Sequence, residues 1–394
     1  FIESCKDIGI PYNPDINTPE GTMGVSEIMT HIDHRGERSS TSTAYLPKSV
    51  LARPNLIVLV DTRITRLLFD TSNADEPRAV GVEISQTADG QRYRVAASKE
   101  VILSAGSIGT PQILMASGVG PKDQLDTAGV EVIKESKHVG QNLFDHLLAC
   151  IVFRATESLD YLSTTSGSLL PLARWFATGT GPLTSNVCEA AAFVRTDDTK
   201  IFGPNEVKDT TSGFNAPDLE IACAGLTFSQ HGFRTAPGEQ GLTMASLGCW
   251  FELGPILLRP KSSGYVTITS GNVWDTAVIE PNYFADPNDV KTLIQGVRLV
   301  LKIAHTKPLV DKIVFKPNQD ESSIFFMGDQ DPATVTDDVI EAWIRREVET
   351  VYHPVGTAKI GTSIENSVVD SELRVHGIKG LRVVDASRIV PERM

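Results

Sequence analysis

The sequence predicts an α/β fold, and three observations lead to this class. A buried strand at residues 101–103 runs directly into a turn of small residues and a short helix, which is the pattern of a βα unit. Closely spaced β-rich runs between residues 56 and 103 indicate a small meander inserted in that domain. Two stretches, residues 289–304 and 337–347, carry apolar side chains at spacings of three and four, which predicts amphipathic helices.

The first part of the chain has the pattern of a helix end, a loop and then several short strands. Residues 1–9 resemble the end of an amphipathic helix that Gly9 closes. Proline, asparagine and glycine break any period between residues 10 and 30, which indicates a loop. The predicted strands that follow are residues 56–60, 64–69, 79–84, 93–97 and 100–103. Because the chain begins inside a helix and without methionine, we expect it to be a piece of a longer protein.

The second part changes to mixed loop and strand before the two helices. Residues 265–268 alternate between apolar and polar, as a half-exposed antiparallel strand does. The other runs that indicate strands are residues 191–194, 219–224 and 256–258. The dipeptide Asp286-Pro287 is a start signal for the first helix, and the second helix leads toward the segment around residue 353.

The composition is that of an ordinary globular protein with a large core. A length of 394 residues predicts two or three domains at roughly 150 residues each. The net charge of -13 argues against nucleic acid or an anionic membrane surface as a partner. No apolar run approaches the roughly 20 residues that span a bilayer, so we expect no membrane partner. Five scattered cysteines predict neither a disulfide framework nor a metal site.

The most specific motif follows the predicted strand at residues 101–103. Ser104, Ala105 and Gly106 form a turn of small residues, which lets a ligand approach the backbone, and a helix N-terminus favours phosphate. We expect Thr110 to be the N-cap of that helix and Pro111 to be its first residue. The alternative from the residues alone is an ordinary packed βα unit without a ligand.

A single histidine near the C-terminus is the second candidate. Pro354 disfavours helical backbone for His353, and a glycine follows two residues later. A lone histidine is more often a core or surface group, but no other histidine of the chain has a comparable frame. Residues 381–384 form a mostly apolar run that ends in Asp385, which is the profile of a buried strand with a polar group at its carboxyl end.

These motifs resemble the signatures of the glucose-methanol-choline (GMC) oxidoreductase family, the flavoenzymes that oxidise alcohols. The stretches that carry the likeness are residues 106–120, 139–146, 351–357, 373–377 and 381–387, with weaker likenesses at 34–46 and at 55–69, which contains Ile64. The resemblance implies an incomplete FAD/NAD(P)-binding-like domain beside a substrate domain of antiparallel sheet plus helices. Residues 1–145 would then be the remainder of the FAD-binding domain and 146–350 the substrate-binding domain. Residues 351–394 would carry the active-site segment and return to the FAD-binding domain.

The resemblance also implies roles for individual residues. His353 would be the catalytic general base, and Tyr352 would line the substrate pocket, although a buried structural tyrosine is an equal alternative. The residues implied in FAD binding are Ile64, Ser104, Ala105, Gly106, Asp385 and Ala386. For Asp385, a turn or capping aspartate is the alternative from the residues alone.

The implied activity is that of an FAD-dependent alcohol oxidase or dehydrogenase. Hydride would pass from the alcohol to flavin N5 while His353 takes the hydroxyl proton, with oxygen or another electron acceptor as the second substrate. Two other classes stay open: a lyase on the same fold that keeps the flavin as a structural part, and a non-catalytic fragment or interaction protein.

Two departures from the family limit the resemblance. The chain contains no Gly-x-Gly-x-x-Gly turn, which the family uses to hold the cofactor's pyrophosphate. The family also places a second catalytic His or Asn after the strand that ends at Asp385, and the sequence reaches Met394 without an equivalent.

We therefore expect the isolated polypeptide of residues 1–394 to carry no FAD and to show no oxidase activity. Each missing charge-assisted hydrogen bond removes about 1.5–3 kcal/mol, so the loss of several weakens binding by orders of magnitude. The measurement is the flavin absorbance of the purified polypeptide. A flavin band near one equivalent, with no second polypeptide present, would contradict this expectation.

Overall fold

The computed structural model describes residues 1–156, 169–225, 250–316 and 326–390, and its contacts divide the chain into two compact units. The first unit comprises residues 1–56, 146–259 and 287–351, and the second comprises residues 57–145, 260–286 and 352–394. The chain passes between the units at 145/146 and 351/352, and also at three other places. The assignment of a cofactor role to one domain and a substrate role to the other stays a prediction.

The first unit is built on a seven-stranded sheet in which every strand pair is antiparallel. Its order is β1-β11-β12-β13-β9-β16, and β10 also pairs with β13. The strands are β1 (Gly24–Glu27), β9 (Leu147–Leu148), β10 (Ile151–Arg154), β11 (Cys188–Val194), β12 (Leu219–Ala224), β13 (Trp250–Leu257) and β16 (Glu349–Thr350). The predicted strands at residues 191–194 and 219–224 are confirmed, and residues 256–257 of the third predicted run end β13.

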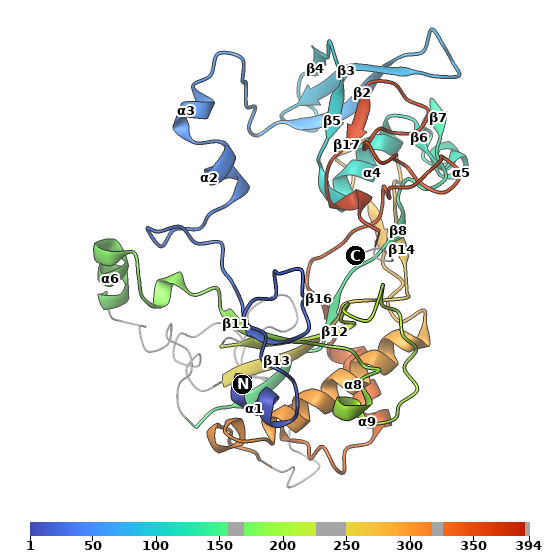
Figure 1. The fold of residues 1–394 in the computed structure, drawn as a ribbon. Coiled ribbons are helices and arrows are strands. Elements are labelled where there is room, and N and C mark those ends of the chain that lie inside the picture. Colours follow the sequence, from blue (N-terminus) through green and yellow to red (C-terminus); the bar gives the residue numbers. More distant parts are fainter. Residues whose placement is uncertain (157–168, 226–249, 317–325, 391–394) are drawn as a thin grey trace. The chain divides into compact units, whose positions relative to one another are not determined.

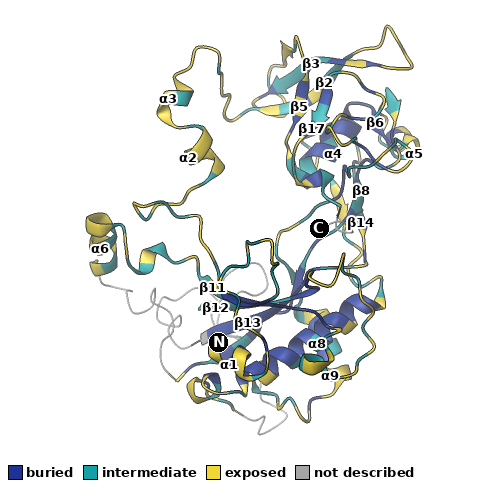
Figure 2. Cartoon of the chain, viewed as in Figure 1, coloured by how far each residue is buried: buried dark blue, intermediate teal, exposed yellow. Residues whose placement is uncertain are grey.

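Two helices confirm the amphipathic patterns of the sequence. The first, α8 (Pro287–Ala304), packs against β12 and β13, and its sheet-facing side chains are buried (Figures 1 and 2). A Cβ at Gly296 would lie 2.6 Å from Cβ of Pro255 and 3.0 Å from Cδ1 of Leu219, so glycine allows this close approach. The second, α9 (Asp337–Glu347), packs against α8, and the side chain of Thr336 caps its N-terminus. The apolar spacing of this helix groups Val339 with Ile340, Trp343 and Ile344, but Val339 is 41% exposed, whereas the other three are buried.

The remaining helices are short. Helix α1 (Ile2–Asp7) is followed by Gly9 at a φ of 98°, which confirms the predicted helix end. The others are α2 (Thr41–Tyr45), α3 (Lys48–Leu51), α5 (Lys122–Thr127), α6 (Leu170–Thr178) and α7 (Thr199–Phe202), with 3-10 turns at Pro182–Thr184, Leu309–Lys312, Met327–Asp329 and Ala386–Arg388.

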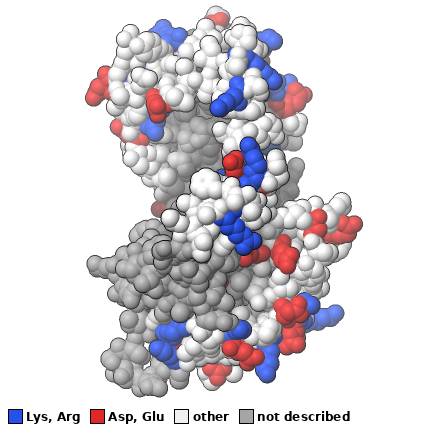
Figure 3. All heavy atoms as spheres, turned by 90° about the vertical axis from the view of Figure 1, so that its left-hand side faces the viewer, with Lys and Arg blue, Asp and Glu red and all other residues white. Residues whose placement is uncertain are grey.

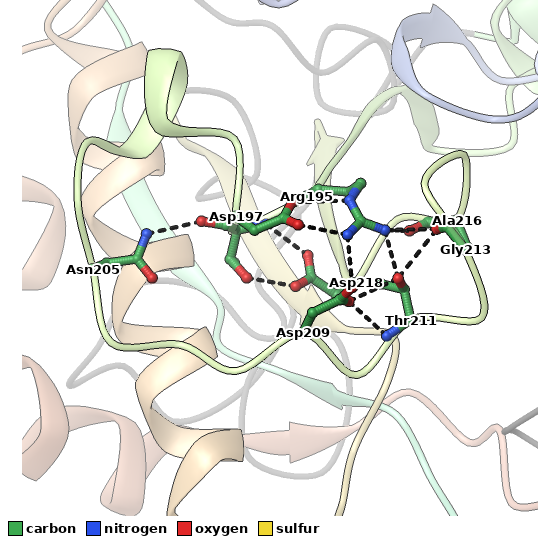
Figure 4. A network of polar contacts seen from close by, with 9 residues as sticks. Arg195, Asp197, Asn205, Asp209, Thr211, Gly213, Ala216 and Asp218 are labelled. Carbon is green, nitrogen blue, oxygen red and sulfur yellow. Dashed lines mark hydrogen bonds and ion pairs between the residues drawn. The ribbon is translucent and has the colours of Figure 1, made fainter.

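A buried arginine closes the long connection between β11 and β12 (Figure 4). The guanidinium of Arg195, whose side chain is 11% exposed, binds both carboxylate oxygens of Asp197, at 2.9 and 2.6 Å. The hydrogen bonds to Asp197 are the main cause that raises the pKa of Arg195 above its ordinary value. Its further acceptors are Asp209, Thr211 and the carbonyl oxygens of Gly213 and Ala216. One side chain thus holds both ends of a loop of about twenty residues.

Replacing Arg195 by methionine is expected to lower the free energy of unfolding by about 1–3 kcal/mol, because two partly buried carbonyl groups and two half-exposed carboxylates lose their donor. Urea unfolding followed by circular dichroism measures the change. Lys291→Met is the matched control, since Lys291 pairs with Glu206 at an exposed site and its loss should leave the midpoint within error. Equal midpoints for the two variants would contradict the expectation.

The second unit contains four small sheets. An antiparallel meander of β2 (Arg63–Asp70), β3 (Arg78–Ser85) and β4 (Tyr93–Ala96) confirms the predicted inserted meander. A parallel pair is formed by β5 (Val101–Leu103) and β17 (Leu381–Val383). The others are the antiparallel β15-β14-β8 sheet (Val278–Glu280, Gly264–Thr267, Gln141–Leu143) and the parallel β6-β7 pair (Val119–Gly120, Lys134–Glu135). Helix α4 (Gly106–Ala116) follows β5 and contributes four of its side chains to the core of this unit.

The strand predicted at residues 56–60 is wrong, because these residues pair with no strand in the described part of the chain. Ile57 is 82% exposed and Val60 is 70% exposed. An apolar run forms a strand only where a neighbouring strand accepts its backbone hydrogen bonds, and the run itself does not show whether that neighbour exists.

Neither the face seen in Figure 3 nor the possible metal ligands mark another site among the described residues. Acidic and basic side chains lie in small groups of both signs on the face seen in Figure 3. Within the described ranges, no helix is long and apolar enough to cross a bilayer, and no three His, Cys, Asp or Glu side chains gather as a metal site.

Candidate active site

The parallel pairing of β5 with β17 brings two remote segments of the second unit together. Leu103 lies opposite Val383 in the register, so the residues that follow both strands emerge at the same edge. The hydroxyl of Ser104 donates to the carbonyl oxygen of Val384 at 2.8 Å, and the Val384 amide donates to the carbonyl oxygen of Leu103 at 2.8 Å. The predicted turn at residues 104–106 therefore lies beside Asp385.

The carboxylate of Asp385 is a junction of four hydrogen bonds. One oxygen accepts from the Gly106 amide at 3.0 Å and from the Thr110 hydroxyl at 2.6 Å. The other accepts from the amide and the hydroxyl of Ser387, at 2.8 and 2.5 Å. Four donors satisfy the ordinary capacity of a carboxylate, so this side chain fixes the turn that contains Gly106.

The turn leaves room for a ligand. Gly106 has a φ of 79°, which favours glycine, and an ideal Cβ there would meet no atom within 4 Å. Ser104, Ala105 and Ala386 are exposed around it. The amides of the α4 N-terminus follow directly, and such a terminus favours an anionic group. This open, glycine-containing turn fits the close approach of a phosphate-bearing cofactor such as FAD.

The predicted N-cap at Thr110 is wrong, because α4 begins at Gly106 and Pro111 lies inside it. Proline lacks an amide hydrogen, so the carbonyl oxygen of Ser107 loses its ordinary partner four residues later. The hydroxyl of Thr357 donates to this carbonyl oxygen at 2.7 Å instead. The irregular helix start thereby binds the segment that follows His353.

Ser107 also makes the second link to that segment. Its hydroxyl donates to the carbonyl oxygen of Pro354 at 2.5 Å. On the other side, Phe144 and Val355 exchange backbone hydrogen bonds of 3.0 and 2.9 Å, and an ideal Cβ on Gly356 would lie 2.2 Å from the carbonyl oxygen of Asn142. Only glycine allows this close contact, and its φ of 93° also favours glycine. The segment therefore fits tightly between α4 and the strand end at residues 142–144.

His353 and Tyr352 lie at the surface of the second unit. Both are exposed, Tyr352 by 64%, so the alternative of a buried structural tyrosine is wrong. Tyr352 has a φ of 61°, a left-handed conformation that is unfavourable for a tyrosine. The backbone amide of His353 donates to Oδ1 of Asp145 at 3.0 Å.

The structure thus connects most of the predicted site residues. Ser104, Ala105, Gly106, Asp385 and Ala386 share one edge, and Ser107 links this edge to the His353 segment. The sixth predicted cofactor residue, Ile64, lies on β2, which packs against α4.

Sequence reasoning missed the roles of Ser107, Asp145 and Thr357. Each makes a hydrogen bond to a residue more than 200 positions away, and no local pattern marks such a bond. Pro111 was the one available signal, because a proline inside a helix frees the carbonyl group four residues earlier, but the sequence placed Pro111 at the first helical position instead.

Comparisons with known proteins agree with this architecture. Two family models described as GMC oxidoreductase match residues 1–148 and residues 260–392. The chain is 39% identical to "Dehydrogenase str4" of Strobilurus tenacellus, over 98% of this chain and 63% of that protein. It is 33% identical to an alcohol dehydrogenase (acceptor) of Pseudomonas putida, over 98% of this chain and 63% of that protein.

Solved structures give the same result. A formate oxidase variant from Aspergillus oryzae, studied for FAD modification, superposes with a TM-score of 0.81 at 28% identity. The alignment covers 99% of this chain and 65% of that one, so the chain spans a little under two thirds of the length of these relatives. With family models over both its ends and this structural likeness along its length, the chain belongs to the GMC oxidoreductase family, whose cofactor is FAD.

Proposed function

We propose that the protein containing this chain oxidises the CH–OH group of a small-molecule alcohol to a carbonyl group, with His353 as general base. One observation carries the proposal: the Ser107 hydroxyl binds the carbonyl oxygen of Pro354, which ties the His353 segment to the turn at residues 104–106. Relatives named as a dehydrogenase and as an alcohol dehydrogenase (acceptor) support alcohols as the substrate class.

The proposed chemistry divides between the histidine and the turn. His353, through an unprotonated ring nitrogen, accepts the hydroxyl proton of the substrate while the carbinol C–H bond breaks. FAD, when bound, supplies the acceptor for the hydride, and oxygen or another acceptor later takes the electrons. Tyr352 lies beside His353 and is proposed to border the substrate. The residues proposed to hold FAD are Ile64, Ser104, Ala105, Gly106, Asp385 and Ala386.

Asp385 has an indirect part in this proposal. Its carboxylate already accepts four hydrogen bonds from the protein, so its main contribution is to hold the Gly106 amide and the turn in place. The alternative of a turn aspartate and the proposed cofactor role are therefore compatible at this position.

Anaerobic mixing of the FAD-loaded protein with a panel of alcohols tests the proposal. Loss of the oxidised flavin band, with the matching aldehyde or ketone formed in equal amount, is the expected result. Turnover of a substrate without any flavin bleaching would indicate a lyase instead. A subsequent admission of air, with oxygen consumption measured, separates an oxidase from a dehydrogenase that needs another acceptor.

A further inference from the structure

We propose that Asp145 is the positioning residue for His353, and that Tyr283 holds the Asp145 carboxylate for this purpose. The inference rests on the proposed function, because it gives His353 a catalytic role. Asp145 lies at the end of the segment after β8, 208 positions before His353, and both belong to the second unit.

The two carboxylate oxygens of Asp145 accept hydrogen bonds from different donors. Oδ1 accepts the backbone N–H of His353 at 3.0 Å, and Oδ2 accepts the Tyr283 hydroxyl at 2.5 Å. Asp145 is 9% exposed, and both bonds are partly buried. A charged acceptor in such a place makes strong, well-oriented hydrogen bonds, and each donor limits the rotation of the carboxylate.

The backbone around His353 explains why a positioning group is needed. Tyr352 is in the left-handed region at a φ of 61°, which a side chain with a Cβ disfavours. Left alone, the chain would relax toward an ordinary φ and turn the His353 side chain elsewhere. Asp145 binds the very next amide, while the Ser107 and Phe144 contacts fix Pro354 and Val355. Strain that is held from both sides in this way is typical of functional sites.

Two substitutions of Asp145 separate hydrogen bonding from charge. Asp145→Ala removes the acceptor, and we expect flavin reduction by alcohol to slow by about 10–100-fold, because a misplacement near 1 Å has effects of this size. Asp145→Asn keeps an oxygen that accepts the His353 amide, and it should restore the rate to within about fivefold of the parent. Tyr283→Phe leaves that bond in place and should give a loss between the two.

A readout that needs neither flavin nor substrate accompanies the rates. Hydrogen exchange of the backbone peptide containing His353 should accelerate in Asp145→Ala and stay near the parent rate in Asp145→Asn. Equal exchange in all variants would overturn the proposal. Asp145→Asn that is as slow in flavin reduction as Asp145→Ala would overturn it too, because charge rather than position would then be the cause.

A double-mutant cycle with His353→Ala separates this inference from the proposed function. If Asp145 acts through His353, Asp145→Ala should have no further effect on flavin reduction in the His353→Ala background. An equal loss in both backgrounds would mean that Asp145 supports the fold in general, and it would overturn the inference. His353→Ala alone reports on the proposed function, since an unchanged rate in that variant contradicts His353 as the base.

Discussion

Replacement of His353 by alanine is expected to slow flavin reduction by about 10²–10⁴-fold while the flavin content of the protein stays unchanged. The two readouts separate because the histidine side chain is exposed, and none of the hydrogen bonds that build the turn at residues 104–106 involves it. The measurement is the rate at which the oxidised flavin band disappears under anaerobic, saturating alcohol. Flavin content is measured on the same preparation.

His138→Ala is a matched control for this variant. Its ring also lies in the second unit, and its Nε2 donates one hydrogen bond to the carbonyl oxygen of Glu365 at 2.8 Å. Loss of that exposed contact should leave the flavin reduction rate within about twofold, as is usual for surface substitutions. The proposed role of His353 is wrong if both variants reduce their flavin at the parent rate.

The sequence predicted the helices and paired strands well, since their signal is local. Apolar spacings of three and four placed α8 and α9 within two residues of their observed bounds. The run at residues 56–60 has the same kind of apolar signal and yet forms no strand in the described chain. Periodicity reports which face of an element is apolar, whereas a strand also requires a partner that no local pattern contains.

The candidate site was predictable by its residue types and not by its connections. The small residues at 104–106 and the histidine before Pro354 are visible in the sequence, but the bonds that join them span more than 200 positions. Thr110 illustrates the difficulty. A threonine before a proline is typical of an N-cap, but its hydroxyl instead donates to Asp385, and the helix begins four residues earlier.

Gly106→Ala is expected to weaken FAD binding by at least about a hundredfold with only a modest loss of stability. The added methyl group meets no protein atom within 4 Å, so the fold bears only the left-handed strain of about 1–2 kcal/mol. In the proposed complex, that space belongs to the cofactor. The methyl group would displace the cofactor from the turn. If two charge-assisted hydrogen bonds between the cofactor's phosphates and the turn are lost, at about 1.5 kcal/mol each, the affinity falls roughly a hundredfold. Flavin absorbance per protein after dialysis against a dilution series of FAD measures the effect.

Gly129→Ala isolates the contribution of the backbone strain. Gly129 has a φ of 68° and also no atom within 4 Å of an ideal Cβ, but it follows α5 and is not among the residues proposed to hold FAD. Both alanine variants should therefore lower the melting temperature by a similar amount, and only Gly106→Ala should lose flavin. If the two variants retain equal flavin, the space beside Gly106 is not where the cofactor approaches, and the turn has a structural role alone. A selective loss at Gly106 would place the cofactor at the edge that β5 and β17 share, within one side chain of the segment that carries His353.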